Sequence, residues 1–279
     1  MIEVFNAITN IAEDIEKDVF QSCTDFLDLN KSDEQIHADV YGHCRTIIRD
    51  EFKKVKSIKG MMGRRSKELT SLNDNGKYIV CYTTIDNVDL LDVDFSLGSI
   101  FAIYENELGA KNLKAAIYIT YGPTFQLVFA TENEGVKFFT HEGNDFVQQE
   151  SFTLSEKGKI NSTAGIQREW SKEHKELIES FFTDGYRLRF SDSLSLDTHQ
   201  ILFKKGGIYS SPATRTHPKG QLHLLFEAYP IAFIMELAGG AATNGQQRIL
   251  DIVHQDAFQK TPIYFGSKSE IERVKEYIK

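Results

Sequence analysis

Apolar residues recur at three- and four-residue steps in the first fifty residues of the chain. In residues 2–26 they include Phe5, Ile8, Ile15 and Val19, which is the stripe of an amphipathic helix. A second helix is predicted from about residue 33 to residue 52, after a polar break. Each stripe needs an apolar partner surface. The two histidines of the second helix do not share a face, so we interpret them as ordinary helix residues.

The pattern then changes to short apolar runs separated by turns. Residues 77–82 and 95–104 are predicted strands, and they flank a polar turn that carries four aspartates. Between Leu113 and Phe152 the runs are rich in Tyr, Phe, Val and Ile, and turns with Gly, Pro or Asn separate them. This pattern is typical of an antiparallel meander.

The second half of the chain mixes helices and strands. A polar stretch from Ser155 to Gly165 predicts a division into residues 1–155 and 156–279. Helices are expected at 171–182 and 193–204, and strands at 185–190, 206–210 and 262–265. The apolar run from Gln221 is predicted to be a strand that ends at Glu227, with Pro230 opening a helix. The last helix is expected to start with a capping box of Ser267 and Glu270.

Composition and charge exclude several classes of protein. The 279 residues are 41% hydrophobic and 26% charged, as in ordinary globular proteins. The net charge of −8 argues against binding to nucleic acid or to an anionic membrane surface, since both need clustered Lys and Arg. The three cysteines form no CxxC pair and are interpreted as buried thiols. Without a leader pattern or a long apolar run, a cytoplasmic location is expected.

Two acidic features are candidates for chemistry. Asp86 and Asp89 lie in the turn after a predicted buried strand, where carboxylates can hold Mg²⁺ beside a phosphate. The same turn also fits a solvated acidic surface. Glu227 is predicted at a strand end beside a helix N-terminus, where it can face a cleft.

The segments around these residues resemble the class I fructose-1,6-bisphosphatases. Residues 76–104 fit the family frame without gaps, although the signature Asp-Pro-Leu-Asp-Gly-Ser-Ser reads Thr-Thr-Ile-Asp-Asn-Val-Asp at 83–89. Glu227, followed by Pro230 and Gly239-Gly240, resembles the family's glutamate, proline and Ala-Gly-Gly. The match runs from about residue 33 to the C-terminus. It implies a layered α/β/α/β/α sandwich and a homo-oligomer, a dimer or tetramer.

The resemblance also implies a metal site with missing ligands. The family binds Mg²⁺ through the signature aspartates, the glutamate at Glu227 and a Ser-Glu-Glu segment. Here Thr83 takes the place of the first aspartate, and the Ser-Glu-Glu segment is matched by Met61, Met62 or Gly63. Neither a thioether nor a glycine can hold Mg²⁺. We therefore expect Mg²⁺ to bind weakly or not at all.

The family's remaining functional positions give further candidates. Asp39 matches the aspartate that helps to activate water. Arg189 matches an arginine that reaches in from a neighbouring subunit and grips the distal phosphate. Other phosphate-gripping positions carry different residues in this chain. The candidates are, for catalysis, Asp39, Asp86 and Glu227; for substrate binding, Arg189, His223, Ser211 and Gln221; and for metal, Asp86, Glu227 and Asp89.

Three functions remain open. The first is a cleft that binds a sugar phosphate or a related polyol, with metal-dependent hydrolysis weakened or lost. The second is a Mg²⁺-dependent phosphatase that converts fructose 1,6-bisphosphate to fructose 6-phosphate through a rebuilt metal site. The third is a lyase, isomerase or cyclase that uses Asp86, Glu227, His223 and Arg189 for acid/base work. The N-terminal helix is shorter than the arm that carries nucleotide regulation in some members of the family, so the resemblance implies no control by AMP.

Overall fold

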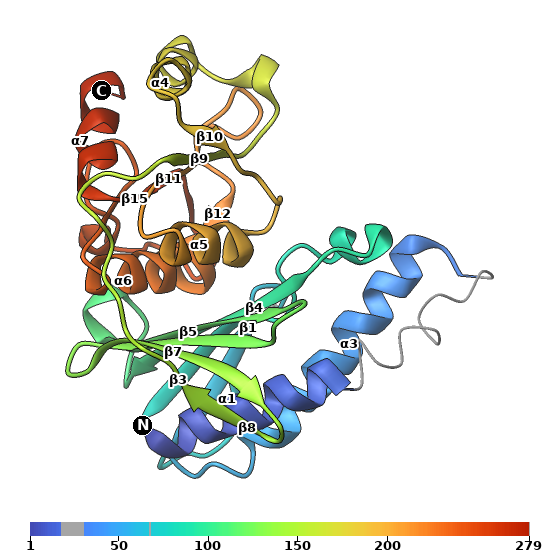
Figure 1. Cartoon of the computed structure of the whole chain (residues 1–279). Helices are drawn as coiled ribbons and strands as arrows, with labels where there is room; N and C mark the ends of the chain where they lie inside the picture. The colour runs from blue at the N-terminus through green and yellow to red at the C-terminus, as the bar shows by residue number, and fades with distance from the viewer. Residues whose placement is uncertain (18–30, 67, 279) are drawn as a thin grey trace.

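The computed structural model describes residues 1–17, 31–66 and 68–278, which form five layers. Two outer helices cover one face of a large sheet, and two further helices separate that sheet from a second one (Figure 1). A last pair of helices covers the far face of the second sheet. The predicted α/β/α/β/α sandwich is confirmed.

The first sheet has eight strands in the order β2-β1-β3-β4-β5-β6-β7-β8. Only β1 and β3 pair in parallel, and the other neighbours are antiparallel, so the predicted meander is confirmed. Its strands are β1 (Ile58–Gly63), β2 (Thr70–Ser71), β3 (Tyr78–Thr83), β4 (Leu97–Glu105), β5 (Leu113–Tyr121), β6 (Gln126–Thr131), β7 (Gly135–Glu142) and β8 (Asp145–Gln148).

Helices α1 (Ile2–Ile15) and α3 (Asp33–Phe52) cover the outer face of this sheet. Ser32 and Gln35 close a capping box at the start of α3, so the break before this helix has a clear physical cause. The predicted first helix begins as expected, but residues 18–26 of it lie outside the described residues. Helix α3 ends in a turn that leads directly into β1.

The middle layer consists of α5 (Leu194–Phe203) and α6 (Tyr229–Leu237). The predicted strand at 221–227 is wrong: β12 covers only Leu222–His223, and a π-helical turn, η5 (Leu224–Ala228), leads into α6. All five side chains of this turn are buried, so the turn carries neither the strand nor the helix periodicity. Pro230 lies in the first turn of α6, as predicted.

The second sheet has the order β10-β9-β11-β15-β13, and α4 (Lys172–Thr183) and α7 (Lys268–Tyr277) cover its outer face. A small separate pair joins β12 to β14. The remaining bounds are β9 (Ile160–Thr163), β10 (Arg187–Leu188), β11 (Ile208–Ser211), β13 (Ala241–Thr243), β14 (Lys260–Thr261) and β15 (Ile263–Gly266), with 3₁₀ turns η2 (Val88–Val93), η3 (Ala110–Asn112), η4 (Gln167–Glu169) and η6 (Ile249–Asp251).

The predicted capping box of α7 is wrong. The Ser267 hydroxyl makes no cap bond to the helix and instead accepts from the Gly207 N–H at 3.3 Å. Glu270 turns inward and accepts from the Gly158 N–H at 2.6 Å and the Tyr186 hydroxyl at 2.7 Å. The carboxylate thus joins α7 to two loops of the second sheet rather than to its own helix end.

The division at residue 155 stays a prediction; this residue lies between β8 and β9. Cys44 and Cys81 are buried free thiols, as expected, and Cys23 lies outside the described residues. Within the described part of the chain, no helix combines the length and the apolarity that crossing a bilayer requires.

Candidate active site

A cleft of about 370 Å³ opens where the two sheets and the middle helices meet. Its walls come from the ends of β1, β3 and β11, from α3, and from the segments before α5 and α6. Predicted site residues that are far apart in the sequence come together here, namely Asp86, Asp89, Ser211, Gln221 and Glu227. The cleft is therefore the candidate active site.

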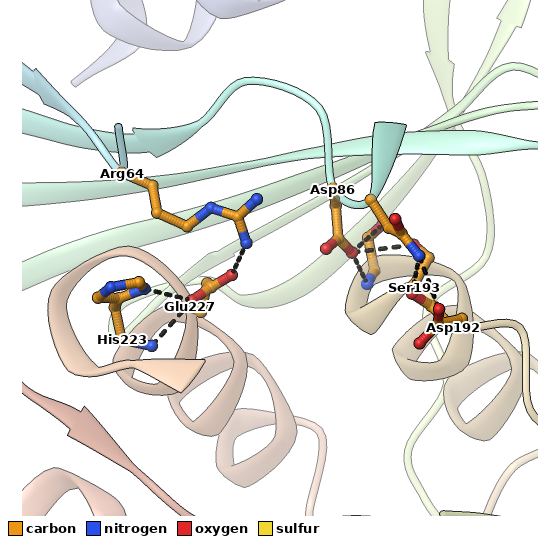
Figure 2. Close-up of polar contacts among 8 residues, drawn as sticks. Arg64, Asp86, Asp192, Ser193, His223 and Glu227 are labelled. Atoms are coloured by element: carbon orange, nitrogen blue, oxygen red, sulfur yellow. Dashed lines mark hydrogen bonds and ion pairs between the residues drawn. The ribbon is translucent and has the colours of Figure 1, made fainter. Parts of the chain in front are cut away.

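Asp86 follows β3 and is 5% exposed. Its Oδ2 accepts from the Ser195 N–H at 2.7 Å, the Ser193 hydroxyl at 2.9 Å and the Ser195 hydroxyl at 3.0 Å (Figure 2). Burial raises the pKa of Asp86, although the Ser195 N–H and the charge of Arg64 act in the other direction. The carboxylate is fixed by the start of α5.

Glu227 lies in the π-helical turn and is 1% exposed. One oxygen accepts from Arg64 Nη1 at 2.5 Å, and the other accepts from the His223 N–H at 2.8 Å and contacts His223 Nδ1 at 3.1 Å (Figure 2). Burial raises the pKa of Glu227, but Arg64 and His223 outweigh it and hold the pKa below the usual range. Glu227 is a carboxylate in a buried ion pair.

Arg64 is the cation at the centre of the cleft. It follows β1, and its side chain is 22% exposed. Burial lowers its pKa, but the carboxylates of Glu227 and Asp86 raise it to a greater extent. Glu227 uses one of the five N–H donors of the guanidinium, so Arg64 keeps donors for a ligand.

The other predicted residues have different surroundings. Asp89 lines the cleft, but its side chain is 77% exposed and its Oδ1 lies 3.4 Å from His37 Nδ1. Asp39 is on the outer part of α3 and pairs with Lys31 at 2.7 Å. Arg189 is exposed and does not line the cleft. His223 acts on the cleft through Glu227. His37, interpreted as an ordinary helix residue, in fact contacts both Asp89 and Asp92.

Comparison with known proteins shows which family has this architecture. The family model described as fructose-1-6-bisphosphatase, N-terminal domain, matches residues 6–150, and the model of the C-terminal domain matches residues 154–279. The chain belongs to the fructose-1,6-bisphosphatase family.

Relatives in this family are similar over the whole chain. The fructose-1,6-bisphosphatase class 1 of Campylobacter hominis is 42% identical, with 99% of both chains covered. That of Campylobacter concisus is 38% identical, with 99% of this chain and 97% of the relative covered. The crystal structure of the apo fructose-1,6-bisphosphatase of Leishmania major has a TM-score of 0.88 at 24% identity, covering 99% of this chain and 92% of the other. That likeness shows the shared fold.

In this structure, protein donors hold Glu227 and Asp86, the buried carboxylates of the cleft that match metal ligands of the fructose-1,6-bisphosphatase family. Both oxygens of Glu227 already accept hydrogen bonds, and Asp86 Oδ2 accepts three. Thr83 is buried, and its hydroxyl has no hydrogen-bond partner among residues 1–17, 31–66 and 68–278. Among the described residues, no cluster of three or more His, Cys, Asp or Glu could hold a metal ion. Arg64 adds a fixed positive charge where a cation would have to bind.

The sequence analysis did not name the residues that reach the cleft from the segment around residues 61–65. Met61 and Met62 belong to the cores on opposite faces of the sheet, and the chain turns into the cleft only at Arg64 and Arg65. Tyr41 and Asp192, which also line the cleft, were missed as well. The signal that could have found the arginines is the one used for Asp86: a charged residue directly after a buried strand.

A substitution at Gly98 tests how tightly Asp86 is held, because Gly98 lies against Ser195, which hydrogen-bonds to Asp86. A Cβ at this position would lie 2.1 Å from Ser195 Oγ and 2.7 Å from the Ile119 carbonyl oxygen. We expect Gly98→Ala to lower the free energy of unfolding by about 2 kcal/mol or more, because Ser195 must move away from Asp86. Urea unfolding measures this. Gly42→Ala on α3 is the control, because nothing lies within 4 Å of its Cβ, so that variant should be slightly stabilised. A neutral Gly98→Ala would contradict the close approach of Ser195.

Proposed function

We propose that this protein binds a sugar phosphate of the fructose 1,6-bisphosphate type, or a related phosphorylated polyol, in the Arg64 cleft, with metal-dependent hydrolysis weakened or lost. The observation that carries the proposal is the buried Arg64–Glu227 ion pair at the centre of the cleft. This ion pair involves Glu227, which matches the glutamate that binds metal in the family. A fixed guanidinium also favours a phosphate, because it offers planar, charged N–H donors.

The class of ligand comes from the family and from the walls of the cleft. The Campylobacter relatives carry the name fructose-1,6-bisphosphatase class 1. The cleft has Ser211, Gln221 and Asp192 beside Arg64, and such polar side chains suit the hydroxyl groups of a sugar. In this proposal Mg²⁺ binds weakly or not at all.

A second candidate is an active Mg²⁺-dependent sugar-phosphate phosphatase. Identities of 38–42% to enzymes of that name, over nearly the whole chain, favour it. In that case Asp86, Asp89 and Glu227 would have to rearrange around a metal ion. The acid/base enzyme and the homo-oligomer stay predictions.

One assay separates the two candidates. Phosphate release from fructose 1,6-bisphosphate and other sugar phosphates is measured with Mg²⁺, with Mn²⁺ and with a chelator, with the Campylobacter hominis enzyme as positive control. Ligand binding is followed in parallel by calorimetry. We expect binding of a sugar phosphate and release at least about 100-fold below the positive control, since the metal contribution to phosphate hydrolysis is large. Chelator-sensitive release at the rate of the control would establish the second candidate instead.

A restored variant strengthens the assay. It combines Thr83→Asp, Asn87→Gly and Val88→Ser, which return a carboxylate and small residues of the family signature to the cleft. A gain of Mg²⁺-dependent release in this variant, with none in the natural protein, would show that the lost side chains account for the difference.

A further inference from the structure

A second cavity of about 240 Å³ adjoins the cleft. The two share Tyr41, Arg64 and Arg65, so they form two lobes of one depression. Their charges differ sharply. The larger lobe is lined by Asp86, Asp89, Asp192 and Glu227, whereas the smaller lobe adds Arg45 and, among the described residues, has no carboxylate in its lining.

Local contacts hold two of the three guanidiniums at the small lobe. Arg64 is anchored by Glu227 at 2.5 Å. The Arg65 guanidinium lies 3.8 Å from the centre of the Tyr41 ring, in a cation–π contact. Arg45 is four residues after Tyr41 on α3, so both residues are on the same face of the helix. In the described part of the chain, neither Arg45 nor Arg65 makes an ion pair with a carboxylate.

The lobe also contains a polar group that lacks a partner. The Tyr41 hydroxyl is buried beside Arg64 and Val88, and in the described part of the chain no group meets the geometry of a full hydrogen bond to it. Buried hydroxyls normally have a hydrogen-bond partner. A buried hydroxyl without one, beside two arginines that pair with no carboxylate of the described residues, therefore indicates a place where a hydrogen-bond acceptor could bind. A phosphate supplies several acceptor oxygens and negative charge at once.

We infer that Arg45, Arg64 and Arg65, with the Tyr41 hydroxyl, form a phosphate site that binds one phosphoryl group of the ligand without a metal ion. This rests on the proposed function, and it specifies how the ligand is held. The phosphoryl group lies in the small lobe, and the polyol hydroxyls extend into the acidic lobe, where carboxylates accept from them. The positive lobe replaces the charge neutralisation that a metal ion would give.

The inference predicts binding that depends on arginine and not on Mg²⁺. Calorimetry is done in a chelator with inorganic phosphate and with fructose 1,6-bisphosphate, on the natural protein and on Arg45→Gln and Arg65→Gln. Both side chains belong to exposed residues, so these variants should fold. Each should weaken binding by about tenfold or more, because a charge-assisted hydrogen bond is lost. Arg49→Gln, which removes a charge from the same helix outside the lobe, should leave affinity within about twofold.

The outcomes separate this inference from the proposed function. Arginine-dependent binding of inorganic phosphate without any binding of fructose 1,6-bisphosphate would support the phosphate site and overturn the proposed ligand. Binding of the bisphosphate that is unchanged in both variants, or that requires Mg²⁺, would overturn the phosphate site and leave the ligand class standing. No binding of either compound would overturn both. We expect Arg45→Gln and Arg65→Gln each to bind inorganic phosphate and fructose 1,6-bisphosphate about tenfold or more weakly, with Arg49→Gln unchanged.

Discussion

Arg64→Met is expected to lower the free energy of unfolding by about 3 to 5 kcal/mol, because it leaves the buried Glu227 carboxylate without its cation. Glu227 is 1% exposed, so water cannot replace the guanidinium. The two His223 contacts remain, but both go to one oxygen of Glu227, so the oxygen that Arg64 held is left without a partner. Urea unfolding at neutral pH measures the loss.

A second substitution shows whether the loss comes from the unpaired charge. Glu227→Gln in the Arg64→Met background removes the charge and keeps the shape, so the double variant should regain a large part of the lost stability. Arg49→Met is the control, since its partner Asp50 is about half exposed and such surface pairs contribute little. A loss below about 1 kcal/mol for Arg64→Met would mean that the ion pair does not form in the folded protein.

Most elements of the fold could be predicted because their signals are local. The stripes of α1 and α3 and the alternating runs of the meander are set by residues close in sequence. The segment 221–227 and the capping box of α7 could not be predicted in this way. Their conformations depend on partners from distant elements: two sheets for the first, and Gly158 and Tyr186 for Glu270.

The candidate site was predicted only in part, for a related reason. Asp86 and Glu227 were found because their motifs resemble those of a family. Arg64 was missed because its role depends on where β1 ends. Met61 and Met62 still point into the two opposite cores, and Arg64, just after the strand, reaches Glu227. No local pattern encodes a partner 163 residues away.

Asp197→Asn is expected to make the variant more stable, relative to the natural protein, as the pH rises. Asp197 on α5 is fully buried, and burial raises its pKa to about 7, with a smaller contribution from the charge of Asp86. Its ordinary pKa is 3.8. The folded protein therefore holds this proton more tightly than the unfolded chain, and the stability that Asp197 contributes at low pH is lost as the pH rises from about 4 to 7. Asparagine does not titrate, so it avoids this loss.

Between pH 4 and pH 7.5, the free energy of unfolding of the Asp197→Asn variant should therefore rise by about 4 kcal/mol relative to that of the natural protein. The difference is the quantity to measure, because burial lowers the pKa of both His174 and His199 to about 4, and these neutral histidines make each protein less stable in acid. That opposite trend is common to both proteins and cancels. Ser191→Ala removes a hydroxyl that donates to Asp197 Oδ1 at 3.0 Å, so it should move the loss of stability to higher pH. A difference that stays flat between pH 4 and 7.5 would show that Asp197 ionises as easily in the folded protein as in the unfolded chain.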